Sequence, residues 1–253
     1  MDWTLRDKVA VVTGGSRGLG LAIAHAYAAA GARLVIASRK GDACARAAAE
    51  IQAASGGECL GVACHVGRWA DCDRLVDAAY ERFGRVDVLV NNAGMSPLYD
   101  HLAAISEALY DKVFAVNLRG AFRLAASIGT RMAAGAGGSI INVSSIAAVQ
   151  PTPNELPYAM AKAGLNAMTV GLARAFGPTV RVNCIMPGPF MTDITKAWDL
   201  DAFARAARTM IPLQRGGEAH EVIGAALYFA TDASSYTTGA VLKIDGGLAF
   251  PPA

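Results

Sequence analysis

The sequence has no long apolar run, no strong excess of one charge and few aromatic side chains. Its longest uninterrupted apolar run, from Ala225 to Ala230, is far shorter than the roughly 20 residues that a membrane-spanning helix requires. The formal net charge is +2 with both signs scattered, so no basic stripe is available for nucleic acid or an anionic membrane. The first residues contain no apolar stretch, and we therefore expect no signal peptide and a cytoplasmic location.

Cysteine is also scarce, and its spacing indicates no metal site. The five cysteines include no Cys-x-x-Cys pair, and His65 beside Cys64 supplies too few ligands for zinc. We therefore expect buried, reduced thiols and no bound metal. Hydrophobic residues make up 53% of the chain and aromatic residues only 7%, so Ala, Val, Leu and Ile must form most of the core. Such a composition suits parallel strands covered by helices on both faces.

Apolar runs of strand length alternate with longer helical stretches along the chain. The expected strands span residues 8–13, 33–38, 58–63, 86–90, 139–143, 180–185 and 241–244. The expected helices span residues 18–30, 42–55, 70–83, 107–117, 121–134, 158–176 and 218–230. This alternation predicts parallel strands joined by right-handed crossovers, in one doubly wound α/β domain over residues 1–253. An insertion at about 188–217 breaks the pattern, and it is either a lid over a site or a packed surface excursion.

A glycine-rich turn joins the first expected strand to the first expected helix. Gly14 permits a tight turn, while Gly18 and Gly20 let the backbone approach a pyrophosphate without a side-chain clash. The N-terminus of the following helix adds oriented N–H groups and a partial positive charge. We expect a dinucleotide to contact the residues of this turn, namely Gly14, Ser16, Arg17, Gly18, Leu19 and Gly20.

The end of the second strand indicates which dinucleotide is bound. NAD sites commonly place an acidic residue there, but this chain has Ser38, Arg39 and Lys40, with Arg17 in the nearby turn. Guanidinium groups bind a 2′-phosphate that a carboxylate would repel, so the pattern predicts NADP as cofactor. The alternative is that these are ordinary solvated cations. Another small-residue segment, Asn92-Ala93-Gly94, closes the fourth strand and is expected either to let the cofactor lie against the backbone or to form a simple turn.

A tyrosine and a lysine lie four residues apart in the expected helix 158–176. At that spacing the Tyr158 hydroxyl and the Lys162 ammonium share one helical face. A cation close to a phenol favours the phenolate, so we expect Lys162 to lower the pKa of Tyr158 and make it useful in proton transfer. Ser145 lies thirteen residues before Tyr158.

Together these residues resemble the short-chain dehydrogenase/reductase family, and the resemblance runs from about residue 7 to residue 247. Its markers occur in order: Thr13-Gly14-x-x-x-Gly18-x-Gly20, Asn91-Asn92-Ala93-Gly94, Asn117, Ser144-Ser145, Tyr158-x-x-x-Lys162, and Pro187-Gly188 with Thr192. The resemblance implies a Rossmann fold whose seven parallel strands follow the order 3-2-1-4-5-6-7, usually in a homotetramer or homodimer. It also implies reversible hydride transfer between a nicotinamide and a carbonyl compound or alcohol.

The resemblance further implies a role for each site residue. Tyr158 exchanges a proton with the substrate oxygen, Ser145 hydrogen-bonds that oxygen, and Lys162 also holds the nicotinamide ribose. Asn117 holds a water that links Lys162 to solvent, or alternatively caps its own helix. The nicotinamide pocket comprises Thr192, the Ile185 backbone, Pro187, Gly188 and Phe190.

One position departs from the family pattern. An aspartate usually follows the third strand and contacts the adenine amino group, whereas this chain has His65 there. The adenine is expected to be held by the Val66 backbone and by packing, and His65 is either an adenine contact or a surface histidine. Residues 38–40, 64–67 and 144–148 resemble those of NADP-dependent carbonyl and retinal reductases.

The substrate is expected to be a hydrophobic ketone or aldehyde, because the expected substrate walls are mostly apolar. These walls comprise Ser96, Pro97, Leu98, Ala147, Pro153, Phe190, Trp198 and Met210. An alternative is a 3-oxoacyl thioester on acyl carrier protein, with Arg131 and Arg174 meeting the acidic partner. A second alternative, of another class, is a non-catalytic NADP sensor with the same fold.

Overall fold

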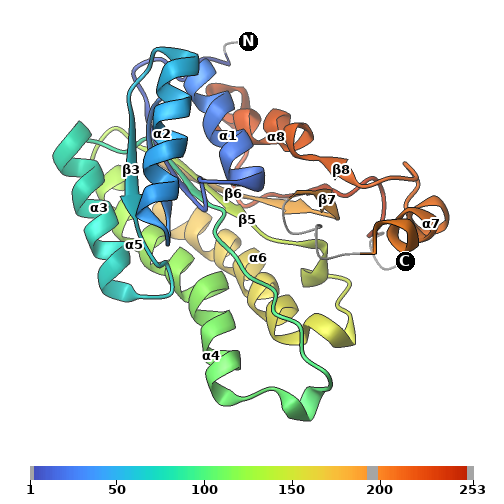
Figure 1. Ribbon diagram of the computed structural model, residues 1–253. Coiled ribbons are helices and arrows are strands. Elements are labelled where there is room, and N and C mark those ends of the chain that lie inside the picture. Colours follow the sequence, from blue (N-terminus) through green and yellow to red (C-terminus); the bar gives the residue numbers. More distant parts are fainter. Residues whose placement is uncertain (1–2, 193–198, 250–253) are drawn as a thin grey trace.

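The computed structural model describes residues 3–192 and 199–249, and a seven-stranded parallel sheet forms its centre (Figure 1). The strands lie in the order β3-β2-β1-β4-β5-β6-β9. They are β1 (Val9–Thr13), β2 (Arg33–Ser38), β3 (Cys59–Ala63), β4 (Val88–Asn91), β5 (Gly138–Val143), β6 (Val180–Pro187) and β9 (Val241–Ile244). Because β9 is the seventh strand of this sheet along the chain, the predicted order 3-2-1-4-5-6-7 is confirmed.

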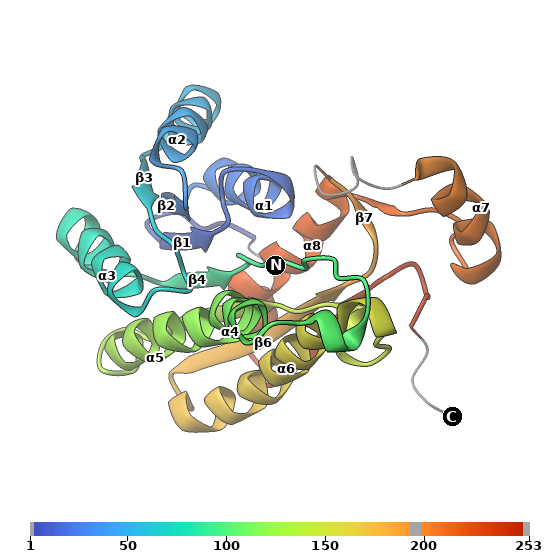
Figure 2. The same cartoon turned by 60° about the horizontal axis from the view of Figure 1, so that its bottom comes forward.

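Helices cover both faces of the sheet, as the doubly wound prediction requires. They are α1 (Gly18–Ala29), α2 (Gly41–Ser55), α3 (Trp69–Phe83), α4 (Glu107–Phe114), α5 (Gly120–Ala133), α6 (Leu156–Phe176), α7 (Leu200–Met210) and α8 (Ile223–Ala230). Figure 2 shows α1 and α2 on the opposite side of the sheet from α5 and α6. None of the helices in the described ranges is long and apolar enough to span a membrane.

The core has two halves because alternate strand residues face opposite ways. Ala10 and Val12 of β1 pack with α1, α2 and α8. Val9 and Val11 pack in a second cluster with α3, α5 and α6. All five residues of β1 are buried, which explains why the strand is a continuous apolar run rather than an alternating one. The five cysteines are buried and free, as predicted.

The sheet order also fixes where a ligand can bind. β1 lies between β2 and β4 in the sheet. The chain first adds β2 and β3 on one side of β1, and then adds β4 and the later strands on the other side. Such a reversal leaves a crevice at the carboxyl ends of the strands. The glycine turn follows β1 and Asn92-Ala93-Gly94 follows β4, so both lie at this crevice.

The helices predicted at 107–117 and 121–134 are joined through a turn of π-helix, Ala115–Arg119, between α4 and α5. Phe114, Arg119 and Gly120 all have right-handed helical torsions, so the backbone continues without a loop. Single π-turns inside α-helices are frequent at functional sites, and this one contains Asn117.

The insertion predicted at 188–217 contains regular structure rather than loop alone. Its short strand β7 (Phe190–Met191) pairs in parallel with β8 (Gly217–Glu218), and α7 lies between them. Residue 198, predicted to form part of a substrate wall, lies outside the described residues. Helix α7 was not predicted, because a stretch that interrupts the strand–helix alternation is interpreted as one irregular excursion.

Candidate functional site

A cavity of about 980 Å³ lies at the carboxyl ends of the sheet strands. It brings together most of the predicted site residues, which come from segments far apart in the chain. Those lining it are Gly14, Ser16, Arg17, Gly18, Leu19, Ser38, Arg39, His65, Val66, Asn92, Ala93, Gly94, Ser145, Tyr158, Lys162, Pro187, Gly188, Phe190 and Thr192. Of the predicted catalytic and cofactor-binding residues, Gly20, Lys40, Asn117 and Ile185 are not among the lining residues.

The glycine turn has the backbone geometry that its sequence predicts. Gly14 and Gly18 have φ angles of 66° and 55°, in the left-handed region that side chains other than glycine rarely adopt. A Cβ on Gly14 would come within 2.7 Å of Asn92 Nδ2. Gly20 is buried beneath the turn, where a Cβ would collide with the Gly14 carbonyl. Its role is therefore to let the turn pack onto α1, rather than to line the cavity.

Thr13 holds the glycine turn against the segment that follows β4. Its hydroxyl donates to Val90 O at 3.2 Å and accepts from Asn92 N at 3.0 Å and Ala93 N at 3.1 Å. The Asn92 amide donates back to Thr13 O at 2.9 Å. Asn92 is predicted from the sequence to contact the cofactor, but its side chain forms a bridge between these two segments.

The end of β2 presents cations to the cavity, as expected. Arg17 and Arg39 are exposed and line it, while Ser38 accepts a hydrogen bond from Ser16 Oγ at 3.0 Å. Lys40 was also predicted to contact the cofactor, but it is exposed at the N-terminus of α2 and does not line the cavity. Helix α2 begins at Gly41, directly after Lys40, whose backbone is still extended.

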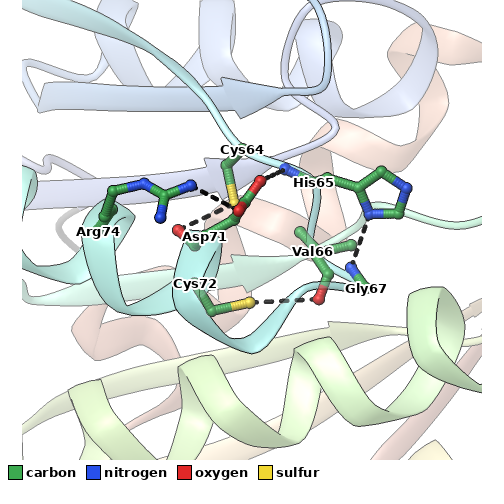
Figure 3. Close-up of polar contacts among 7 residues, drawn as sticks. All are labelled: Cys64, His65, Val66, Gly67, Asp71, Cys72 and Arg74. Atoms are coloured by element: carbon green, nitrogen blue, oxygen red, sulfur yellow. Dashed lines mark hydrogen bonds and ion pairs between the residues drawn. The ribbon is translucent and has the colours of Figure 1, made fainter.

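His65 is held in one orientation by backbone hydrogen bonds (Figure 3). Gly67 N donates to its Nδ1 at 3.2 Å, and its own N donates to Asp71 Oδ2 at 3.0 Å. The bond from His65 N is the main cause that lowers the pKa of Asp71, with Arg74 adding to it. Because Nδ1 is already an acceptor, the neutral ring presents an Nε2–H donor. It therefore does not reproduce the acceptor that an aspartate would offer.

Lys162 is buried on α6, with only 3% of its surface exposed. Its ammonium donates to Val143 O at 2.7 Å and lies 5.6 Å from the centre of the Tyr158 ring. Burial disfavours the charged form and lowers the pKa of Lys162 to about 8.

The pKa of Tyr158 departs from the prediction. The phenol forms part of the cavity wall, and its burial raises the pKa to about 12, with the Ser145 side chain opposing the increase and the negative charge of Glu155 adding to it. The predicted lowering by Lys162 is therefore wrong for this arrangement. The ammonium lies against the ring and is bonded to Val143 O, so loss of solvent around the phenol dominates.

The two adjacent serines have different surroundings. Ser144 is buried and donates to Lys162 O at 3.1 Å, which ties β5 to α6. Ser145 lines the cavity, and its Oγ accepts from Ala147 N at 3.2 Å. The hydroxyl available to a ligand is thus that of Ser145.

Asn117 is buried, and its side chain is committed to backbone groups. Oδ1 accepts from Met95 N at 3.0 Å, and Nδ2 donates to Met95 O at 2.8 Å and Val113 O at 2.9 Å. Its side chain therefore fixes the loop after β4 to the α4–α5 helix. The bond to Val113 O agrees in part with the alternative of capping its own helix.

The end of the cavity beyond Tyr158 has an apolar wall from α7 and a polar wall from the segment before α6. Ser96, Leu98, Ala147, Phe190 and Met210 line the cavity as predicted, whereas Pro97 and Pro153 do not. Further lining residues were not predicted from the sequence: Ile146, Gln150, Thr152, Asn154, Glu155, Phe203, Ala206, Ala207, Ile211 and Leu248. The position of Glu155, three residues before Tyr158, was a usable signal because residues so spaced near a helix start lie close together.

Arg131 and Arg174 do not lie near the cavity. Both are in the last turns of their helices, α5 and α6, which lead away from the carboxyl ends of the strands. Arg131 pairs with Asp77 at 3.4 Å and lies over the Tyr80 ring. They do not form a docking surface beside the site. Within the described ranges, no group of three or more His, Cys, Asp and Glu side chains is placed to hold a metal ion.

The chain is similar to known oxidoreductases over nearly its whole length. A family model described as enoyl-(acyl carrier protein) reductase matches residues 14–249. L-rhamnose 1-dehydrogenase (NAD(P)(+)) of Azotobacter vinelandii is 41% identical, with 96% of this chain and 97% of that protein covered. Dehydrogenase/reductase SDR family member 4 of Bos taurus is 36% identical, with 96% and 88% covered.

A solved structure shares both the fold and part of the sequence. The crystal structure of L-sorbose reductase from Gluconobacter frateurii, complexed with NADPH and L-sorbose, matches with a TM-score of 0.92 and 31% identity, covering 98% of each chain. With the sheet order and the motifs above, these matches show the family. The chain belongs to the short-chain dehydrogenase/reductase family, whose members are oxidoreductases of alcohols and carbonyl compounds.

Proposed function

We propose that this protein uses NADP(H) to reduce a hydrophobic ketone or aldehyde reversibly to an alcohol. One observation carries the proposal: Ser145, Tyr158 and Lys162 line the same cavity as the glycine turn and two arginines. A proton donor, a hydroxyl partner and a phosphate-binding end thus share one space.

The cavity residues fit a phosphorylated dinucleotide. The turn at Gly14 and Gly18 is open to the cavity, and α1 has no acidic residue in its first turn to repel a pyrophosphate. Gly94 also lines the cavity, and a Cβ there would come within 2.9 Å of Asn117 Oδ1, so glycine lets the loop after β4 pack against Asn117. Arg17 and Arg39 are the groups that would hold a 2′-phosphate. The NADPH complex of L-sorbose reductase supports this choice by similarity.

The bound cofactor would supply the hydride, and the protein's own residues would control the proton. Tyr158, with its raised pKa, holds the proton at neutral pH and donates it to the substrate oxygen as negative charge builds there. The Ser145 hydroxyl hydrogen-bonds the same oxygen and fixes its direction. Lys162 contributes a buried positive charge near the phenol. Asn117 acts by positioning the Met95 loop.

The α7 side of the cavity supports an apolar substrate group. Phe203, Ala207 and Met210 of α7 belong to the lining, and Leu248 joins them. A hydrophobic ketone or aldehyde would bury its apolar part there.

The proposal is tested by following NADPH absorbance with a panel of diketones, long-chain aldehydes, steroids and an acetoacetyl thioester. We expect turnover with at least one apolar carbonyl compound, and loss of at least about 10³-fold in Tyr158→Phe with NADPH binding retained. Tight NADPH binding without turnover of any member would instead indicate a non-catalytic sensor. Turnover confined to the acyl thioester would favour the 3-oxoacyl reductase alternative, and substantial activity in Tyr158→Phe would refute the assigned proton donor.

A further inference from the structure

Among the residues that the structure describes, the substrate end of the cavity carries a carboxylate and no arginine. Of the residues lining the cavity, Arg17 and Arg39 lie at the cofactor end, where the glycine turn and β2 finish. Lys162 is bonded to Val143 O behind the Tyr158 ring. Among the described lining residues, Glu155 is the acidic one, and it directly precedes α6, three residues before Tyr158. A ligand group that extends from the phenol to this part of the cavity wall therefore meets a negative charge.

The Glu155 side chain is held in position by its local structure. It ends the short 3₁₀ turn Pro153–Glu155 and directly precedes α6, where the helix dipole favours an anion. Thr152 Oγ1 donates to its Oε1 at 3.1 Å. The loop is fixed from the other side by Tyr99, whose hydroxyl donates to Pro153 O at 2.6 Å and accepts from Leu156 N at 2.8 Å.

The carboxylate is also close enough to influence the reacting group. Its negative charge contributes to the raised pKa of Tyr158, which a distant, screened charge would not do. Neighbouring lining residues Gln150, Thr152 and Asn154 are polar but uncharged, so they do not neutralise it.

We propose that Glu155 determines specificity by selecting carbonyl substrates with a cationic group, such as a protonated amine, beyond the carbonyl and by rejecting keto acids. The apolar wall of α7 then accommodates the hydrocarbon part of the substrate, between its carbonyl and its cationic group. This inference rests on the proposed reductase function and narrows its substrate class to amino ketones. An ion pair in a partly enclosed cavity is stronger than one on the surface, and a tenfold preference corresponds to about 1.4 kcal/mol.

The test uses three ketones of similar size that differ in charge: 1-methylpiperidin-4-one, 4-methylcyclohexanone and 4-oxocyclohexanecarboxylate. With NADPH at pH 7, kcat/KM is measured for each, and a ketone that is not reduced is measured as a competitive inhibitor of the best carbonyl in the panel. We expect the cationic ketone to be preferred over the anionic one by at least about 10-fold in the wild type. In Glu155→Gln this ratio should fall to within about threefold of unity.

Two control variants separate this local charge from other effects. Glu155→Asp keeps the carboxylate and should keep the order of preference. Glu81→Gln removes an equal charge from an exposed position on α3 and should leave the ratio unchanged. An equal cation-to-anion ratio in wild type and Glu155→Gln would overturn the inference, and turnover of the neutral ketone would still uphold the reductase. Absence of turnover with every carbonyl compound tested would overturn both.

Discussion

The side chain of Asn117 both accepts a hydrogen bond from the backbone of Met95 and donates one to it. Its Oδ1 accepts from Met95 N at 3.0 Å, and its Nδ2 donates to Met95 O at 2.8 Å. The π-turn that contains Asn117 is thereby joined to the loop after β4, which forms one side of the cavity. A residue that the family pattern associates with proton transfer thus has a structural task that the geometry makes explicit.

Replacing Asn117 by Asp should destabilise the protein. A carboxylate keeps the acceptor for Met95 N but turns a second oxygen toward the Met95 and Val113 carbonyls, which then lose their donor. Because the site is buried, we expect a loss of about 2–4 kcal/mol in the free energy of unfolding, measured by urea denaturation. The control is Asn154→Asp, the same change at an exposed position, which should alter stability little. Equal stability of Asn117→Asp and wild type would contradict this account.

The sequence predicted where these site residues gather, but not what surrounds each one. The positions of Ser145, Tyr158 and Lys162 follow from helical spacing and from the end of a parallel strand, which are local properties. The pKa of Tyr158 depends on how much water its neighbours remove, and that depends on segments far away in the chain. For this reason the direction of its pKa shift was predicted wrongly, although Tyr158 does line the same cavity as the glycine turn.

The buried charge of Lys162 should lower the free energy of unfolding. Its pKa is lowered from 10.5 to about 8, so the folded state binds fewer protons than the unfolded state between these values. The burial penalty is therefore complete below about pH 8 and is relieved as the pH rises toward 10.5. At 1.36 kcal/mol per pKa unit, the burial penalty on the charged lysine is about 3 kcal/mol. A substitution that removes the lysine relieves this penalty but also loses the hydrogen bond to Val143 O, which offsets roughly 1–2 kcal/mol of the gain.

We therefore expect Lys162→Met to be about 1–2 kcal/mol more stable than wild type at pH 7, with little reductase activity. The difference should shrink as the pH approaches 10.5, because the wild-type lysine then loses its charge in both states. Urea unfolding at several pH values measures this, with Lys112→Met on the exposed side of α4 as control. A variant that is less stable at pH 7 and shows no pH trend would disprove the prediction.

The family resemblance implied the order of the sheet, and each strand was predictable because it is a short apolar run closed by turn residues. The π-turn at Ala115–Arg119 was not, since it leaves the spacing of apolar residues in the surrounding helix almost unchanged. Helix α7 was missed for another reason. It covers the cavity instead of a face of the sheet, and Ala207 is its single buried residue, so it stands outside the regular alternation of strands and helices.

Arg39 should discriminate between the two nicotinamide cofactors. It lines the cavity, whereas its neighbour Lys40 does not, which provides a matched pair of cations. Charge-assisted hydrogen bonds are worth about 1.5–3 kcal/mol, so Arg39→Gln should weaken NADPH binding by about 10- to 100-fold and affect NADH little. Lys40→Gln should change both by less than about threefold. Fluorescence titration with each cofactor distinguishes the outcomes, and equal losses for NADPH and NADH would argue against a 2′-phosphate contact.

Thr13 should matter through its hydroxyl rather than its size. The hydroxyl accepts from Asn92 N and Ala93 N in a buried position. Thr13→Val keeps the shape but leaves both N–H groups without this acceptor, so we expect a loss of about 2–4 kcal/mol in unfolding free energy and weaker cofactor binding. Thr13→Ser retains the acceptor and should cost less than about 1.5 kcal/mol. Equal effects of the two substitutions would show that packing, not hydrogen bonding, holds these segments together.

The pH dependence of carbonyl reduction should follow the charge of Lys162. Reduction needs the Tyr158 proton, and with a pKa of about 12 the phenol keeps this proton across the neutral range. The upper pH limit of reduction is therefore set by Lys162. As the pH rises through about 8, Lys162 loses its charge, and kcat/KM for the carbonyl compound should fall. Initial rates from about pH 6 to about pH 10 measure this limb. Reduction that stays constant over that whole range would show that the charge of Lys162 is not required.

Oxidation of the alcohol should show the opposite trend, because it needs the phenolate of Tyr158. Its rate should rise with pH as this form becomes populated, toward the phenol pKa of about 12. The negative charge of Glu155 contributes to that pKa, and Glu155→Gln removes it, so the rise should begin at lower pH in this variant. Initial rates of oxidation, measured at matched pH values in wild type and Glu155→Gln, compare the two pH profiles. Coincident profiles would mean that the carboxylate does not reach the phenol electrostatically.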